Sequence, residues 1–280
     1  MPGSEDIMKR VWGIFFWVFL IATGKGQVFH SPVQSAYLTG GAYSAHFTDA
    51  FSFTGNPAVL GSAKTFCLAG SSERRWMLKE LDYYRMACSF SAGRGGIGLQ
   101  FQYTGNPDYN ETAFALSYGK DLGRIFLGLQ FRYDIDHAAG YGNKEYGSAL
   151  LGLRFHPSDK IYAGFAFSAS FFGDAGNNRS EKAPGNYNMG FGYEASALVF
   201  ISLQLEKEPG IPLNIIGCLD YRWNDQFFAA MGIASVSASP YLKAGWKKNR
   251  LTIGLFTAYH TELGFTPGLV LLWEGKNKSG

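Results

Sequence analysis

Residues 124–136 read RIFLGLQFRYDID, a run in which every second side chain is large and apolar. The odd-numbered positions hold Ile, Leu, Phe and Tyr, whereas most even-numbered positions hold Gly, Gln, Arg or Asp. Successive side chains of a β-strand point to opposite faces, so this pattern predicts a strand with one apolar and one polar face. An amphipathic helix would instead repeat its apolar residues every third or fourth position.

The same alternation returns about fourteen times between Thr65 and Trp273, each time followed by a turn rich in Gly, Asn, Asp or Pro. Residues 97–104 and 199–206 show it clearly. Short alternating segments joined by turns are typical of antiparallel β-barrels. We therefore predict an all-β chain: an antiparallel transmembrane β-barrel of about 14 strands over residues 62–275, with a C-terminal tail at 276–280.

The start of the chain predicts export. Met8, Lys9 and Arg10 precede an apolar run at residues 11–22, and small residues follow up to residue 26. A basic region, a short apolar region and small residues form a secretory signal peptide, so we assign residues 1–26 to one. Glu5 and Asp6 are unusual before such a run, which leaves open whether translation starts at Met1 or Met8. An uncleaved anchor on a soluble domain is the alternative, although the run is short for a membrane span.

The second face of the strands distinguishes a membrane barrel from a soluble sandwich. A sandwich would place Lys, Glu, Thr and Ser there, facing water, but here the face is rich in glycine and alanine. The chain contains 36 Gly, 24 Phe and 16 Tyr, which fits small lumen-facing residues combined with aromatic girdles. The glycines assigned to the lumen face are Gly98, Gly119, Gly128, Gly152, Gly164, Gly190, Gly192, Gly232, Gly245 and Gly254.

The predicted connections alternate in length. Ala92–Gly96 and Lys120–Gly123 are short, whereas Ser72–Asp82, Asp136–Gly147 and Ser170–Asn186 are long. Bacterial outer-membrane barrels have short periplasmic turns and longer extracellular loops. This rhythm predicts a bacterial outer-membrane protein with both termini in the periplasm, surrounded by outer-membrane lipid and lipopolysaccharide.

Residues 27–61 do not alternate and precede the first strand. They contain Gly-Gly-Ala from Gly40 and Gly41, an Asp-Ala pair at Asp49, and Asn-Pro-Ala at residues 56–58. This order resembles the amino-terminal segment of the FadL-like (long-chain fatty acid transporter) outer-membrane superfamily, including its PorV/PorQ-like branch. The resemblance implies a fourteen-stranded barrel with an N-terminal hatch in its lumen, whose motif here is Gly40, Gly41, Asp49, Asn56, Pro57 and Ala58.

A hatch also has a physical rationale, because about thirty non-repetitive residues need somewhere to pack. Asn56 and Pro57 form a turn that could fold the segment back into the lumen; the alternative is a rigid turn and nothing more. A filled lumen argues against a general porin.

Charged side chains on the polar face are expected to pair in a partly dry lumen. We predict a charge network that joins wall to hatch, and the alternative is that some of these groups line a solute path. The network residues are Arg132, Asp134, Asp136, Arg154, Glu206, Asp220 and Arg222; Arg85, Gln130, Glu194, Gln204 and His260 share their face.

Several functions are disfavoured. Neither His137 nor His260 lies near a nucleophile motif, so we expect no enzyme. Three cysteines without metal-ligand spacing predict no metal or cofactor, and a net charge of +3 is too small for a nucleic-acid partner.

Two functional classes remain. In one, the barrel docks a protein, like PorV and PorQ in type IX secretion; in the other, it is a FadL-like channel for small apolar ligands. Aromatic and Arg residues in the outer loops fit a contact surface, or equally an aromatic girdle. A short chain and a small-residue lumen favour docking. A purely structural barrel is the third alternative.

Overall fold

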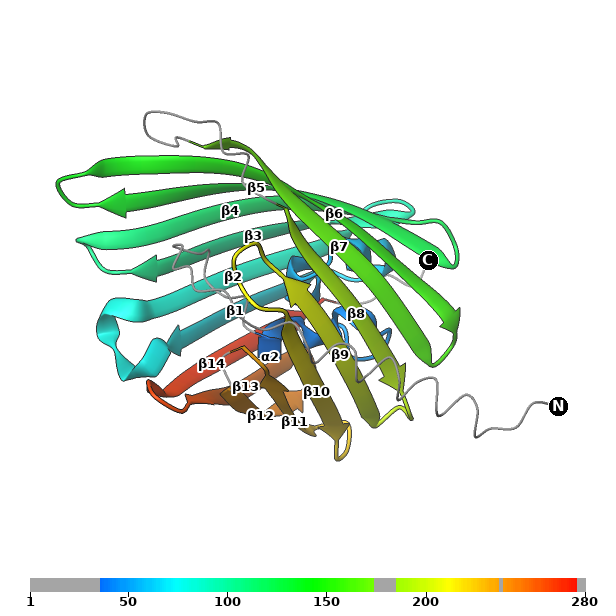
Figure 1. Cartoon of the computed structure of the whole chain (residues 1–280). Coiled ribbons are helices and arrows are strands. Elements are labelled where there is room, and N and C mark those ends of the chain that lie inside the picture. Colours follow the sequence, from blue (N-terminus) through cyan, green and yellow to red (C-terminus); the bar gives the residue numbers. More distant parts are fainter. Residues whose placement is uncertain (1–35, 174–184, 237–238, 276–280) are drawn as a thin grey trace.

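The computed structural model describes residues 36–173, 185–236 and 239–275. Within them, fourteen antiparallel strands pair in sequence order, and β1 pairs with β14 to close the barrel (Figure 1). The predicted all-β transmembrane barrel fold is confirmed. The strands are β1 (Cys67–Arg74), β2 (Asp82–Ser91), β3 (Gly95–Gly105), β4 (Tyr109–Asp121), β5 (Ile125–Ala138), β6 (Gly142–Ser158), β7 (Ile161–Gly173), β8 (Asn186–Glu194), β9 (Val199–Lys207), β10 (Asn214–Arg222), β11 (Phe227–Ala234), β12 (Ser239–Lys248), β13 (Leu251–His260) and β14 (Gly264–Glu274).

The alternation has the predicted phase. In β5, Ile125 and Phe131 are 46% and 52% exposed on the outside, whereas Phe126 between them is 8% exposed and faces the lumen. A continuous outer layer of large apolar side chains suits contact with hydrocarbon. No helix among the described residues is both long and apolar enough to span a membrane.

One side of the barrel wall is taller than the other. Strands β4, β5, β6 and β7 are 13, 14, 17 and 13 residues long, whereas the other strands are 8 to 11. These long strands extend beyond their neighbours at the end opposite the short turns (Figure 1). We call strands β4–β7 the tall wall.

The tall wall corrects one expectation. We expected a long loop at Asp136–Gly147, but β5 runs to Ala138 and β6 begins at Gly142, with Asp136 paired to Lys144. Gly140 and Gly142 both have φ of 82°, a conformation that suits glycine in a tight turn. The alternation continues into this hairpin with polar residues on one face, and polarity alone made it resemble a loop.

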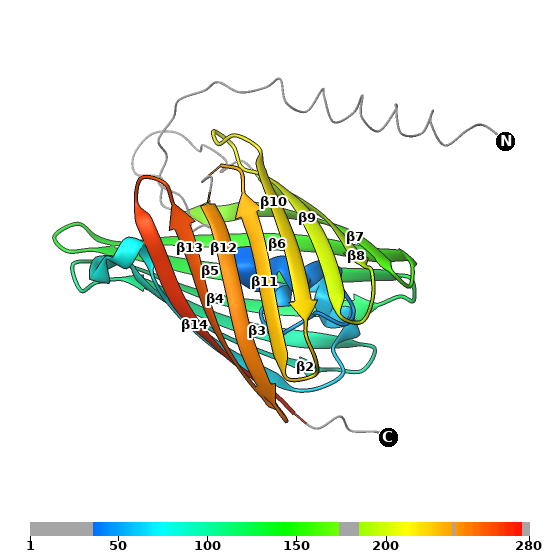
Figure 2. The ribbon, with the colours of Figure 1, turned by 90° about the horizontal axis from the view of Figure 1, so that it is seen from below.

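Residues 36–62 lie inside the barrel; we call them the lumenal segment (Figures 1 and 2). It contains α2 (Ala36–Thr39) and the 3₁₀ helices η1 (Gly40–Tyr43), η2 (Ser52–Thr54) and η3 (Pro57–Ser62). Tyr43, Phe51 and Phe53 are at most 1% exposed and pack in one core cluster with apolar side chains of the wall. The hydrophobic core therefore lies between the lumenal segment and the barrel. The predicted signal peptide, residues 27–35 and the tail at 276–280 lie outside the described residues.

Candidate functional site

A row of glycines forms the seat of the lumenal segment. Gly96, Gly119, Gly128 and Gly152 are paired directly across β3, β4, β5 and β6. A Cβ atom at Gly119 would collide with backbone atoms of residues 57 and 61, and one at Gly128 with backbone atoms of residues 57 and 58. Only glycine permits this approach of two backbones. We call these four residues the glycine row, and it explains why η3 lies against the wall of the barrel rather than in its centre.

Asn56 connects the lumenal segment to the next strands. Its side chain is fully buried; Oδ1 accepts a hydrogen bond from the Ala58 backbone N–H at 3.0 Å, and Nδ2 donates one to the Leu153 carbonyl at 3.1 Å. Pro57 is the first residue of η3, where its missing N–H costs nothing. The Asn-Pro pair therefore both caps η3 and binds the segment to β6.

The other motif residues shape the segment itself. Asp49 Oδ1 accepts hydrogen bonds from the backbone N–H groups of Phe51 (2.9 Å) and Ser52 (3.0 Å). A Cβ atom at Gly41 would collide with the Phe47 carbonyl, whereas one at Gly40 would have ordinary contact distances. Asp49 and Gly41 thus fix the local turns, and Gly40 has no such constraint.

Glu194, near the inner end of β8, binds the segment most extensively. Its Oε1 accepts hydrogen bonds from Ser44 Oγ (2.6 Å), Ala45 N–H (2.7 Å) and His46 N–H (3.1 Å), and its Oε2 lies 2.6 Å from His46 Nδ1. The Glu194 side chain is 5% exposed. A buried carboxylate with this many donors is fully compensated.

Two arginines of the wall bind backbone and side-chain oxygens of the segment. Arg154 donates to the Ser44 carbonyl (3.1 Å) and to Ser62 Oγ (2.7 Å), and its guanidinium lies over the Phe126 ring. Arg222 donates to the His46 carbonyl at 2.6 Å. We call Glu194, Arg154 and Arg222 the clamp, because they hold both ends of the stretch 44–62 from three different strands.

Tyr43 adds a further contact on the same side. Burial raises the pKa of its phenol well above the ordinary value, so the hydroxyl stays protonated and donates to Asn188 Oδ1 at 3.1 Å. Its ring occupies the space that a Cβ atom at Gly190 would need. Tyr43 and Asn188 were not predicted from the sequence; the aromatic residue directly after Gly-Gly-Ala was the available signal.

The remaining predicted charges lie elsewhere in the lumen. Arg132 pairs with Asp134 at 2.7 Å, Glu206 accepts from Asn188 and Asn214, and Asp220 accepts from Cys218 Sγ at 3.2 Å. Within the described residues, no hydrogen bond or ion pair connects the Arg132–Asp134 pair to Arg154. The seven predicted residues therefore fall into separate groups. Arg154 and Arg222 contact the lumenal segment, Asp220 contacts Cys218, and Arg132, Asp134, Asp136 and Glu206 line a cavity.

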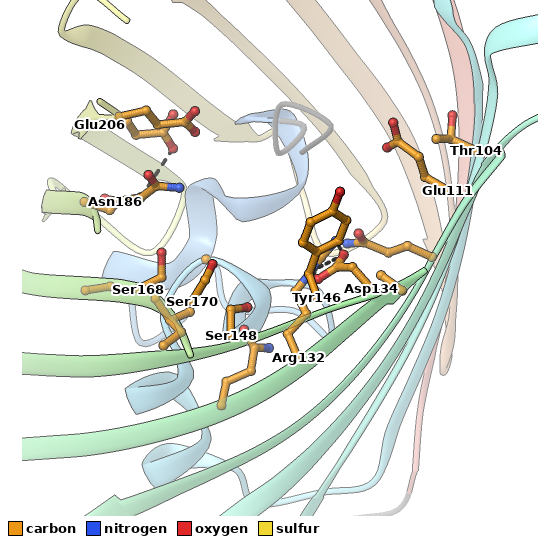
Figure 3. Close-up of a pocket in the computed structure, with 18 of the residues that line it drawn as sticks. Thr104, Glu111, Arg132, Asp134, Tyr146, Ser148, Ser168, Ser170, Asn186 and Glu206 are labelled. Atoms are coloured by element: carbon orange, nitrogen blue, oxygen red, sulfur yellow. Dashed lines mark hydrogen bonds and ion pairs between the residues drawn. The ribbon is translucent and has the colours of Figure 1, made fainter. Parts of the chain in front are cut away.

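That cavity, which we call the polar cup, has a volume of about 390 Å³. Gly55 of the lumenal segment lies at its base, and its sides come mainly from the tall wall and from β2, β3, β8 and β9. Figure 3 shows carboxylate, hydroxyl and amide groups converging on the space from both sides. Its polar lining includes Gln102, Thr104, Glu111, Gln130, Arg132, Asp134, Asp136, Tyr146, Ser148, Ser168, Ser170, Asn186, Asn188, Glu206 and Glu208.

Two apolar grooves lie on the outside of the barrel. One, of about 610 Å³, is lined by outward side chains such as Met86, Leu99 and Phe114, and the other, of about 680 Å³, by Leu127, Leu151 and others. Outward apolar side chains are the lipid-facing layer of such a barrel, so lipid is expected to fill both grooves.

Comparison with protein-family models gave no match to this sequence, and neither did comparison with curated protein sequences. Solved structures do match. The CymD monoaromatic hydrocarbon channel aligns with a TM-score of 0.58 and 11% identity over 88% of this chain and 97% of its own. The Pseudomonas putida toluene transporter TodX aligns with a TM-score of 0.57 and 8% identity over 86% of this chain and 96% of its own. A Pseudomonas aeruginosa FadL homologue aligns with a TM-score of 0.55 and 9% identity over 90% of this chain and 99% of its own. CymD and TodX are a channel and a transporter, not enzymes. This chain therefore shares the barrel fold of these bacterial outer-membrane proteins.

Proposed function

We propose that this protein is an outer-membrane barrel that docks another protein, as an accessory of secretion or outer-membrane assembly, and is not an open pore. The observation that carries the proposal is the closed lumen. The lumenal segment sits on the glycine row and is held by the clamp. Breaking one buried, hydrogen-bonded charge contact of this kind costs about 3–5 kcal/mol, so an open state would be rare.

The chemistry of the lumen supports docking over passage of apolar ligands. The polar cup above the segment is lined largely by hydroxyl, amide and charged groups, which an apolar ligand would have to desolvate. The large apolar surfaces of the described residues are on the outside of the barrel, where lipid or a partner would cover them. A role like that of PorV and PorQ, with a protein of a type IX-type secretion system as partner, fits a barrel with this closed lumen.

The orientation is part of the proposal. With residues 1–26 as a signal peptide, the chain would enter the barrel from the periplasm, and the short turns next to the lumenal segment would face the same side. The tall wall and the mouth of the polar cup would then face outward through the lipopolysaccharide layer.

Two measurements on the purified full-length protein test the proposal. Planar-bilayer recordings are expected to show no steady conductance for the unchanged protein, and transient openings for a double variant, Arg154→Met with Glu194→Ala, whose clamp is weakened. Mass spectrometry of material purified from the native outer membrane in mild detergent is expected to find a stoichiometric protein partner. A steady pore in the unchanged protein would contradict the proposal.

The second candidate is a channel for small hydrophobic ligands. It is favoured by the fold shared with CymD, TodX and the FadL homologue. An extractable apolar ligand without a protein partner, found in the same mass-spectrometric experiment, would support this candidate and replace the docking proposal.

A further inference from the structure

The polar cup has a charge opposite to that of the whole chain. The chain has a formal net charge of +3, but the described residues that line the cup include a single guanidinium, that of Arg132, against five carboxylates. These are Glu111, Asp134, Asp136, Glu206 and Glu208. The acidic character is therefore a local property of the cavity and not a consequence of composition.

Hydrogen bonds inside the cup leave most of this charge uncompensated. The Arg132 guanidinium is already paired with Asp134, at 2.7 Å. Glu206 accepts from the neutral amides of Asn188 (3.3 Å) and Asn214 (3.2 Å), which bring no positive charge to it. A cation bound among such carboxylates relieves their mutual repulsion and is attracted to each of them.

Glu111 and Asp136 concentrate the repulsion. They face each other directly across the β4–β5 pair, both on the lumen side of the tall wall. Glu111 accepts a hydrogen bond from the Tyr109 hydroxyl at 2.8 Å, and Asp136 has no hydrogen-bond partner within the described part of the chain. Lys144 lies opposite Asp136 in the β5–β6 register, and its side chain is exposed to solvent.

The remaining lining is suited to an organic cation. Tyr109 and Tyr146 both line the cup, and their rings can accept an ammonium or guanidinium group. Gln102, Gln130 and Ser148 add acceptors for further N–H or O–H groups. The volume of about 390 Å³ is suited to a small molecule or to one or two side chains. No three ligand-type side chains of the described residues are grouped closely enough to hold a metal ion.

We propose that the polar cup is a binding site for an organic cation, a primary ammonium or guanidinium group on a short hydrophilic chain. The carboxylates of Glu111 and Asp136 provide the charge, the Tyr109 and Tyr146 rings provide the faces of the site, and the opening at the tall-wall end provides access. This site goes beyond the proposed docking function and does not depend on it, because the charged and aromatic side chains that line the cup all come from the barrel.

The test is calorimetric titration of the purified full-length protein in detergent with three probes: spermidine, tri-lysine amide and the neutral sugar chitotriose. Both cations are expected to bind, and chitotriose is expected not to bind. The affinity for the cations is expected to fall as NaCl is raised from 50 to 200 mM, because salt screens the attraction. Glu111→Gln combined with Asp136→Asn is expected to weaken cation binding by about tenfold or more. If spermidine binds as tightly as tri-lysine amide, free amines are a source of the ligand. If only the peptide binds, the ligand is a basic segment of a protein.

The matched control is Glu80→Gln, which removes a carboxylate from the exposed β1–β2 connection outside the cup. It is expected to leave cation binding unchanged. Heat-modifiable migration in gel electrophoresis establishes that each variant still forms a barrel. Binding of chitotriose as strong as that of the cations, cation binding equal in the double variant and the control, or no cation binding by the unchanged protein would overturn the proposal.

Discussion

At the scale of single residues, a few buried polar groups determine where the lumenal segment lies. Glu194 accepts from three donors of residues 44–46 with one oxygen and contacts His46 with the other. A charged group that is removed from water contributes to stability only when its partners are all in place. The position of the segment therefore depends on complete satisfaction of Glu194, and loss of this carboxylate leaves the buried Ser44 hydroxyl and two backbone N–H groups without their acceptor.

Glu194→Ala is expected to destabilise docking of the lumenal segment by about 3 kcal/mol, because it leaves the buried Ser44 hydroxyl and two backbone N–H groups without their acceptor. Limited proteolysis of the detergent-solubilised protein measures this, as faster cleavage between residues 40 and 62. Glu194→Gln keeps an acceptor oxygen, so a smaller increase is expected. The exposed Glu80→Ala is the control, and equal cleavage of Glu194→Ala and Glu80→Ala would contradict the assignment.

At the scale of elements, the strands provide space for the segment as well as closing the barrel. The glycine row crosses β3 to β6, and backbone atoms of η3 fill the space where Cβ atoms would otherwise lie. Glycine is unfavourable within strands, so its repeated use here has a cost in sheet stability. The close contact of η3 with the wall offsets that cost.

Gly128→Val is expected to displace η3 and to destabilise the protein by at least about 2 kcal/mol, since the new side chain meets the backbone of residues 57 and 58. Gly70→Val is the matched control, because a Cβ atom at Gly70, on the outer side of β1, meets nothing within 4 Å. Urea-unfolding midpoints followed by tryptophan fluorescence compare the two. Equal midpoints would show that the glycine row does not seat the segment.

At the scale of the whole molecule, the two ends of the barrel differ in height and in chemistry. The lumenal segment closes the lumen near the short turns, and the polar cup opens toward the tall wall. An apolar outer layer around both levels fixes the protein in a bilayer. The two ends therefore meet different compartments, and the polar cup opens at one of them.

Cysteine labelling in intact cells measures which end is outside. In a background with Cys67→Ala, Cys88→Ala and Cys218→Ser, Tyr141→Cys at the tip of the tall wall is expected to react with a membrane-impermeant maleimide, since Tyr141 is 93% exposed. Asp225→Cys, in the short β10–β11 turn, is expected to react only after the outer membrane is permeabilised. The reverse pattern would invert the proposed orientation.

The alternating pattern determined the barrel by itself. Strand number, the face that each side chain takes and the lumen position of the glycines all follow from a period of two, because neighbouring side chains of a strand must point to opposite sides. The Asn-Pro turn was visible for a similar reason: both residues act on their own backbone. What failed was the end of the tall wall, where a polar lumen face resembles a loop.

Tertiary structure decided which charges act together. Arg132 and Arg154 occupy the lumen faces of adjacent strands, yet one pairs within the polar cup and the other binds the lumenal segment. The contacts with the lumenal segment join residues that are distant in sequence: Arg154 lies 110 residues from Ser44, and Glu194 lies 150 residues from it. Local sequence specifies which face of a strand a side chain takes. It does not specify the depth at which a distant segment of the chain contacts that face. That depth depends on the packed barrel, because packing and buried hydrogen bonds are satisfied only in three dimensions.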